Sequence, residues 1–280
     1  MNARQEFLRR FARNKPALAG VAVLALIALA GALAGLLFPA SPWDMAGQPF
    51  IWPGDSAEFP LGTDMMGRDL ATGLFYGARV SLIIGIVATA VAVLIGVSVG
   101  AAAGYYGSGT DRMLMRITEL FQTIPPFIFA IVLVAILRPS VQTIVIAIGL
   151  VSWPAVARLV RAEFMALRQR EFVHAAISMG MSDLRIVLTQ ILPNALPAII
   201  VTGSLNVATA ILLEGGLAFL GLGDPNVMSW GTIIGAGRDA LRSAWYIATL
   251  PGLAILFTVL AINLVGEGLN DALNPRMRNR

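Results

Sequence analysis

Long apolar stretches alternate along this chain with short polar segments. A helix needs about 20 apolar residues to cross the hydrocarbon core of a membrane, where no water is present to pair with its backbone groups. Six stretches reach or approach this length, at residues 17–38, 80–106, 120–137, 141–157, 191–213 and 244–266. The pattern predicts an all-α, polytopic membrane protein with six transmembrane helices.

The third and fourth stretches are the shortest and contain prolines. Pro125 and Pro126 fall inside stretch 120–137, and Pro154 falls inside stretch 141–157. A proline within a membrane helix leaves a backbone carbonyl without its usual partner, which neighbouring helices or a water-filled path can supply. We therefore expect both stretches to be interrupted membrane helices.

The first stretch follows a basic segment, which is also the layout of a secretory signal. A signal peptide has an apolar core of about 7–15 residues followed by a small-residue cleavage site. Stretch 17–38 is longer and runs into Phe38 and Pro39. We interpret it as an uncleaved membrane anchor that follows a short N-terminal segment, residues 1–16.

Composition supports a membrane environment and narrows the chemistry. The chain is 57% hydrophobic and 13% charged, with a mean hydropathy of +0.78. Its net charge of +4 would suggest a nucleic-acid partner in a soluble chain, but basic residues in a membrane chain usually record topology, so we expect no nucleic-acid partner. The absence of cysteine excludes disulfides and thiolate chemistry, and the single histidine, His174, excludes a multi-histidine metal site.

The distribution of arginine and lysine predicts the orientation. With a cytoplasmic N-terminus and six crossings, most of the 20 basic residues face the cytoplasm. The exceptions are Arg68, Arg79, Arg138, Arg238 and Arg242. This distribution follows the positive-inside rule. It places both termini and the polar segment 170–197 in the cytoplasm, and segment 39–79 outside.

Segment 170–197 has the pattern of two short amphipathic helices. Four apolar residues recur at helical spacing on one face of the first helix: Phe172, Ala175, Ala176 and Met179. Other faces carry Glu171, His174 and Ser178. Gly180 is expected to end this helix, because glycine readily takes the left-handed conformation just past a helix end. We call residues 170–193 the elbow.

The second half of the elbow predicts another helix with its own start and stop signals. Ser182 can cap this helix, and Asp183 lies in its first turn, where the helix dipole favours a negative charge. Its apolar face would carry Leu184, Val187, Leu188 and Ile191. Pro193 is expected to break the helix.

The elbow also carries a family resemblance. His174-Ala175-Ala176, Gly180 and Gln190-Ile191-Leu192-Pro193 resemble the "EAA…G…I-LP" cytoplasmic loop of ABC-importer permeases, with His174 and Gln190 departing from the pattern. In that family the loop carries a coupling helix that seats on an ATPase subunit. The resemblance assigns this role to Glu171, Phe172, His174, Ala175, Ala176, Met179 and Gly180. The alternative is a pair of surface helices that pack on the protein's own loops.

Three further signatures are similar to one subfamily. The pattern LGTD…GRD…YGAR.S spans residues 61–81, the pattern E…FLGLG…P…WG spans 214–231, and NLVGEGLNDALNP spans 263–275. In this order they resemble the C-type permeases of dipeptide, oligopeptide and nickel importers. The resemblance implies the transmembrane domain of a type I ABC importer, with a core at residues 80–268 and a cytoplasmic tail at 269–280.

The resemblance also implies partners and a function. The chain would be half of the translocation path of an ATP-driven importer in a bacterial inner membrane. It would work with a B-type permease, two ATPase subunits and an extracytoplasmic solute-binding protein. ATP and magnesium would bind to the ATPase partners, since the chain has no GxxxxGK[S/T] loop and no cofactor of its own. Short peptides are the leading cargo, while nickel chelates, opines and saccharide-like solutes remain open.

Small residues and polar residues within the apolar stretches suggest further roles. Gly96, Gly100 and Gly104 recur at every fourth position and predict close helix packing. Three polar side chains are candidates for the lining of the translocation path: Gln122, Asn206 and Glu214. Hydrogen bonds between helices are the alternative role for each. Asp64 and Asp69 fit turns and local ion pairs better than a calcium loop.

Two other classes of protein compete with this interpretation. An ion-coupled secondary transporter or channel would act without an ATPase, but the sequence shows no internal repeat to support it. An intramembrane enzyme would need a nucleophile with a base, or a metal site, and one histidine with scattered carboxylates forms neither.

Overall fold

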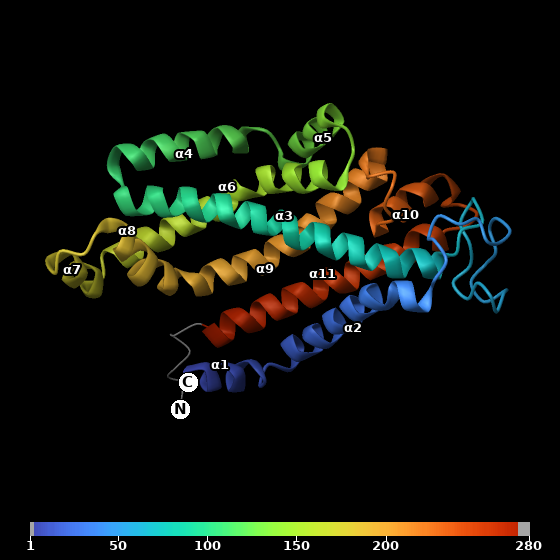
Figure 1. Ribbon diagram of the computed structural model, residues 1–280, viewed down its shortest axis with the longest axis horizontal. Coiled ribbons are helices and arrows are strands. Elements are labelled where there is room, and N and C mark those ends of the chain that lie inside the picture. Colours follow the sequence, from blue (N-terminus) through green and yellow to red (C-terminus); the bar gives the residue numbers. More distant parts are fainter. Residues whose placement is uncertain (1–2, 274–280) are drawn as a thin grey trace.

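The computed structural model describes residues 3–273, which are almost entirely helical (Figure 1). The long helices run roughly along the long axis of the molecule. In chain order the elements are α1 Ala3–Phe11, α2 Lys15–Leu37, α3 Leu70–Tyr106, α4 Ser108–Thr123, α5 Pro126–Leu137, α6 Val141–Arg168, α7 Glu171–Ser178, α8 Asp183–Ile186, the π-helical turn η1 Val187–Ile191, α9 Leu192–Leu217, the π-helical turn η2 Ala218–Leu222, α10 Trp230–Gly237, the 3₁₀ turn η3 Arg238–Ala240 and α11 Tyr246–Leu273.

Five helical segments are long and apolar enough to cross a membrane. They are α2, α3, α6, the continuous run Asp183–Leu222 and α11, and the bent pair α4 and α5 would make a sixth. The predicted all-α polytopic fold is confirmed. Residues 274–280, which hold most of the predicted tail 269–280, and residues 1–2 of the predicted N-terminal segment lie outside the described residues.

The third predicted stretch, 120–137, is interrupted at its prolines, as expected. It is divided between the end of α4 and the whole of α5, which meet at an angle of 81°. Pro125 and Pro126 cause the break, because Pro126 has no backbone N–H to continue the ladder and Pro125 holds Ile124 in an extended conformation. The 12 residues of α5 would extend only about 18 Å, so this helix alone is too short to cross the hydrocarbon core.

The predicted break at Pro193 is wrong, since the helix continues from Asp183 through Leu222. The π-helical turn η1 precedes the proline, and the N–H of Leu192 bonds to the carbonyl of Val187, five residues back. Pro193 therefore lies in the first turn of α9, immediately after a widened turn. The expected interruption at Pro154 is also wrong, because α6 continues through this proline from Val141 to Arg168.

The glycine spacing in α3 places that helix against α6, as predicted. A Cβ at Gly96 would lie 2.6 Å from the Cβ of Val156, and one at Gly104 would lie 2.6 Å from the Cβ of Phe164. A Cβ at Gly100 would collide with the carbonyl oxygen of Ala157. Such close approach lets two helices associate in lipid, where the hydrophobic effect does not drive them together.

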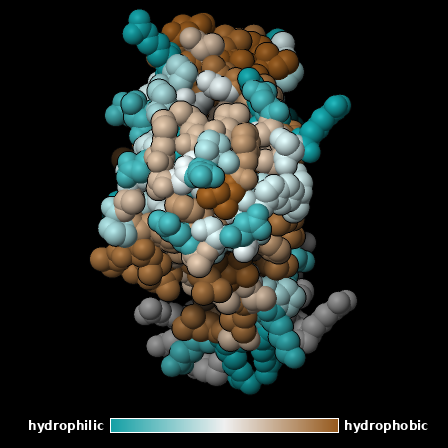
Figure 2. Space-filling view, turned by 90° about the vertical axis from the view of Figure 1, so that its right-hand side faces the viewer, coloured by the Kyte–Doolittle hydropathy of each residue, from teal (hydrophilic) through white to brown (hydrophobic). Residues whose placement is uncertain are grey.

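The two ends of the molecule differ in structure. The elbow, α1 and the last turns of α11 lie toward one end, and the loop between α2 and α3 lies at the other end beside α10 (Figure 1). Viewed onto the loop end, hydrophilic side chains spread over the middle of the face, and the top of the molecule, at the height of α5, is mostly hydrophobic (Figure 2). We call the loop between Phe38 and Asp69 the α2–α3 loop.

Candidate functional site

The elbow begins with α7, which ends as the sequence predicts. Gly180 has a φ of +76°, and its N–H bonds to the carbonyl of Ile177 at 2.9 Å. The N–H of Met181 bonds to the carbonyl of Ala176 at 3.2 Å. This pair of bonds is the Schellman arrangement that closes a helix with a glycine.

The face of α7 that packs against the protein differs from the predicted face. Val173 and Ala176 are buried, in a cluster with Val160 and Phe164 of α6. Phe172, Ala175 and Met179 are exposed, and Met179 has an exposed fraction of 74%. Three of the four residues predicted to share an apolar face therefore remain uncovered in this chain.

The second half of the elbow repeats this arrangement. Ile186 and Ile191 are fully buried, whereas Leu184 and Leu188 are exposed at 66% and 51%. Ser182 stands at the N-cap position of α8 but makes no capping hydrogen bond. Asp183 instead accepts a hydrogen bond of 2.8 Å from the hydroxyl of Tyr105, at the end of α3.

Polar residues lie beside the uncovered apolar face of the elbow. Glu171 and His174 are both exposed on α7. The elbow therefore combines exposed apolar side chains, polar neighbours and a firmly packed underside. Interfaces between proteins combine an apolar centre with a polar rim in the same way.

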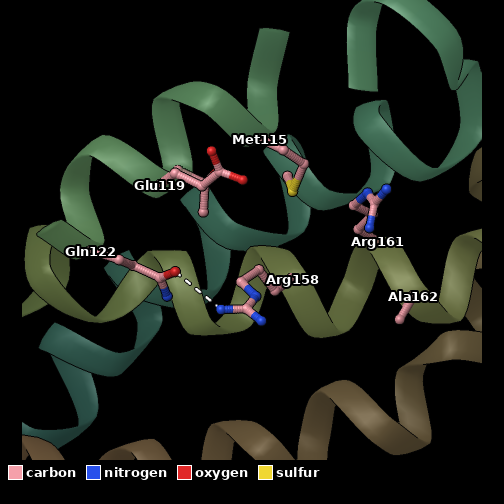
Figure 3. Close-up of a pocket in the computed structure, with 7 residues that line it drawn as sticks. Met115, Glu119, Gln122, Arg158, Arg161 and Ala162 are labelled. Carbon is pink, nitrogen blue, oxygen red and sulfur yellow. Dashed lines mark hydrogen bonds between the residues drawn. The ribbon is translucent and has the colours of Figure 1, made fainter. Parts of the chain in front are cut away.

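A second candidate site is a groove between α4 and α6, which we call the α4–α6 groove (Figure 3). Its volume is about 520 Å³. The lining residues are Met115, Thr118, Glu119 and Gln122 of α4 and Arg158, Arg161 and Ala162 of α6. On each helix these residues recur at spacings of one, three and four, so they lie on one face.

The two arginines of the groove are held differently. Arg161 forms a two-pronged ion pair with Asp111 of α4, with N–O distances of 2.5 and 2.6 Å. Arg158 donates a single hydrogen bond of 3.2 Å to the side-chain oxygen of Gln122. Among residues 3–273, neither Arg158 nor Glu119 forms an ion pair.

Glu214 is buried in a network that joins three parts of the chain. Its exposed fraction is 1%, and it accepts hydrogen bonds from Ser229 at 2.6 Å and from Ser81 at 3.4 Å. Ser229 also caps α10 by accepting a bond from the N–H of Thr232. Glu214 therefore links α9 to α3 and to the start of α10. This is the alternative role expected for Glu214, a hydrogen bond between helices in place of a position in the path lining.

The three residues predicted to line a path occupy separate environments. Gln122 lines the α4–α6 groove, whereas Glu214 is enclosed by Ser81 and Ser229. Asn206 lies on α9, and its buried amide nitrogen has no hydrogen-bond partner among the described residues. The structure of this chain alone does not bring the three together.

The acidic residues near the start of α3 act in local structure. Asp64 accepts hydrogen bonds from the backbone N–H groups of Met66 and Arg68, and Asp69 caps α3 through the N–H groups of Ala71 and Thr72. Within residues 3–273, no group of three or more histidine, aspartate or glutamate side chains is arranged to hold a metal ion.

Comparison with known proteins agrees with the fold and the motifs. Residues 96–279 match the family described as binding-protein-dependent transport system inner membrane component, and residues 3–58 match the N-terminal TM domain of oligopeptide transport permease C. The chain therefore belongs to the family of inner-membrane permeases of binding-protein-dependent ABC importers. Within it, the chain belongs to the dipeptide, oligopeptide and nickel group of C-type permeases.

Individual relatives extend over nearly the whole chain. The chain is 39% identical over 281 residues to a di/tripeptide transport system permease of Pseudomonas aeruginosa, covering 98% of this chain and 93% of that protein. It is 38% identical over 277 residues to a glutathione transport system permease of Pectobacterium atrosepticum, covering 98% and 92%.

A solved structure shares the fold. It is a chain of the MetNI methionine ABC transporter in an inward-facing conformation, with a TM-score of 0.61 and 19% sequence identity, covering 72% of this chain and 96% of that chain. The fold is that of a type I ABC importer.

Sequence reasoning missed two features of these sites. The hydrogen bond between Tyr105 and Asp183 joins residues 78 positions apart, and no local pattern predicts it. The α4–α6 groove had a detectable signal, because Arg158 and Arg161 follow each other at helical spacing, as do Thr118, Glu119 and Gln122. The positive-inside rule accounts for both arginines in the sequence and gives no reason to expect a groove between helices.

Proposed function

We propose that this permease forms one half of the translocation path for short peptides, beside a B-type permease subunit. Two ATPase subunits with bound ATP and magnesium would supply the energy, and an extracytoplasmic binding protein would deliver the solute. The names of the relatives support the peptide cargo, since they include transporters of di- and tripeptides and of glutathione.

The observation that carries this proposal is the uncovered apolar face of the elbow. Phe172, Met179, Leu184 and Leu188 are exposed although the opposite side of the elbow is packed into the protein. An exposed apolar patch with polar neighbours is typical of a protein-binding site. We assign this face to the ATPase contact, with Glu171 and His174 at its polar edge and Ala175 and Gly180 as its small residues. Ala176, which the family resemblance also assigns to this contact, is buried against α6 and supports the face from beneath.

The arrangement of the chain supports a cytoplasmic elbow and cytoplasmic termini. The N-terminal helix α1, the end of α11 and the elbow lie toward the same end of the molecule (Figure 1). The side chain of Asn14, just after α1, donates a hydrogen bond of 3.2 Å to Asp271 near the end of α11. Combined with the arginine distribution, this arrangement favours cytoplasmic termini with the α2–α3 loop outside. The family description and the bacterial relatives support a bacterial inner membrane as the location.

The test is a single charge placed on the exposed apolar face. Met179→Asp changes a side chain that contributes little to folding, because it is 74% exposed. We expect the variant to insert into the membrane normally, to lose the ATPase subunits on co-purification and to lose ATP-driven uptake of labelled dialanine.

The matched control is Ser178→Asp, which places the same charge on the polar face of the same helix. We expect it to retain the ATPase subunits and uptake. If Met179→Asp retains both at the wild-type level, the apolar face is not the contact, and the assignment of the elbow fails.

A further inference from the structure

Two opposite charges in the α4–α6 groove are not neutralised by any side chain among the described residues. Arg161 is neutralised by Asp111, whereas within residues 3–273 the one hydrogen bond of the Arg158 side chain is to the neutral amide of Gln122. Glu119 lies on the facing helix and forms no ion pair within residues 3–273. Figure 3 shows its carboxylate standing apart from the Arg158 guanidinium. The groove therefore offers one negatively charged side chain, Glu119, that can bind a cation, and one positively charged side chain, Arg158, that can bind an anion.

These charges are unsuited to contact with lipid chains. A charged side chain among acyl chains is costly, and such residues usually face a water-filled cavity or a polar partner. The groove runs between the polar faces of α4 and α6, and both residues are exposed in it. An occupant that carries both charges would satisfy Glu119 and Arg158 together.

The size of the groove restricts that occupant to a small solute. A volume of about 520 Å³ lies within the range of small-molecule sites. A dipeptide in extended form spans about 7 Å between its charged ends. Its ammonium group matches the Glu119 carboxylate, and its carboxylate matches the guanidinium of Arg158, which binds planar oxyanions well.

We infer that Glu119 and Arg158 hold the two charged ends of a zwitterionic solute in the α4–α6 groove during translocation, with Gln122 orienting Arg158. This inference rests on the proposed function and adds the chemistry of recognition inside the permease. The Asp111–Arg161 ion pair keeps the two helices in place beside the groove.

The test uses the complete importer, purified with its companion subunits and binding protein and reconstituted into liposomes with labelled dialanine. We expect Glu119→Gln and Arg158→Gln each to lower uptake per ATP hydrolysed by about tenfold, the effect of losing roughly 1.4 kcal/mol of binding. The exchange of both charges, E119R with R158E, should recover part of the loss. Arg116→Gln is the matched control, since Arg116 is exposed on α4 outside the groove lining and should leave uptake unchanged.

A zwitterionic lipid headgroup carries the same pair of charges, and the lipid composition distinguishes this source. In liposomes made only of phosphatidylglycerol, whose headgroup carries no cationic group, the losses should persist if the solute is the occupant. Their disappearance would identify a headgroup and overturn the inference. So would wild-type uptake by both variants, or loss of the second permease from the complex. A wild-type importer that shows no ATP-dependent dialanine uptake would instead contradict the proposed function.

Discussion

The hydroxyl of Tyr105 donates a hydrogen bond of 2.8 Å to the carboxylate of Asp183. This bond joins the last turn of α3 to the first residue of α8, within the elbow. The guanidinium of Arg168, at the end of α6, lies 5.6 Å from the centre of the Tyr105 ring. Tyr105 therefore contacts the elbow and the end of α6 together.

The first prediction removes this connection without changing the size of the side chain. Tyr105→Phe deletes a hydrogen bond to a charged group, which is typically worth about 1.5–3 kcal/mol. We expect the reconstituted importer to take up less dialanine for each ATP hydrolysed, because the elbow moves with less restraint from α3. Tyr106→Phe, at an exposed neighbouring position, should behave like the wild type. Equal uptake per ATP hydrolysed in both variants would show that the hydrogen bond between Tyr105 and Asp183 does not contribute to coupling.

The second prediction concerns the close packing of α3 on α6. Gly100→Ala would force a Cβ against the carbonyl of Ala157 and to within 2.8 Å of the Cβ of Val160. Overpacking of this kind lowers the free energy of unfolding by about 1–3 kcal/mol. We expect a lower midpoint in thermal unfolding of the detergent-solubilised protein.

Gly203→Ala is the control for this experiment. It adds the same methyl group inside α9, where the nearest atom from another helix is a Val93 methyl carbon at 3.8 Å. This variant should keep the wild-type midpoint or exceed it, because alanine favours helix over glycine. Identical midpoints for the two variants would contradict the packing argument.

The third prediction tests the buried network around Glu214. Glu214→Gln keeps an oxygen for Ser229 and supplies a donor toward Ser81, so the folded state should be retained. Glu214→Leu leaves the two serine hydroxyls without their partner and should lower the free energy of unfolding by about 1–3 kcal/mol. Thermal unfolding of the two variants measures the difference. If the leucine variant is as stable as the glutamine variant, the network does not hold α9, α3 and α10 together.

The parts of the fold that sequence could predict are those governed by local rules. The apolar lengths identified the membrane helices, and the spacing of Gly96, Gly100 and Gly104 identified a packing face. Gly180 ended α7 because its φ of +76° suits glycine. Each of these features depends on residues within a few turns of one another.

The missed features depend on tertiary contacts. Helix α3 begins at Leu70, ten residues before the predicted stretch at 80, because Asp69 caps a less apolar extension that hydropathy alone does not mark. On α7, Val173 faces the protein in place of Phe172, since the docking of the elbow on α6 decides which of two adjacent apolar residues turns inward. Likewise, the groove exists only because α4 folds back along α6.

The length and continuity of helix α3 determine how movement can be transmitted along the protein. Its 37 residues extend about 55 Å, well beyond the hydrocarbon core, and contain no proline. It starts at the cap supplied by Asp69, beside the α2–α3 loop, and ends at Tyr106, one residue after the Tyr105 that bonds to the elbow. One unbroken helix thus connects the elbow to the α2–α3 loop. Under the proposed function, a displacement of the elbow by an ATPase would therefore reach the side of solute arrival without passing a hinge.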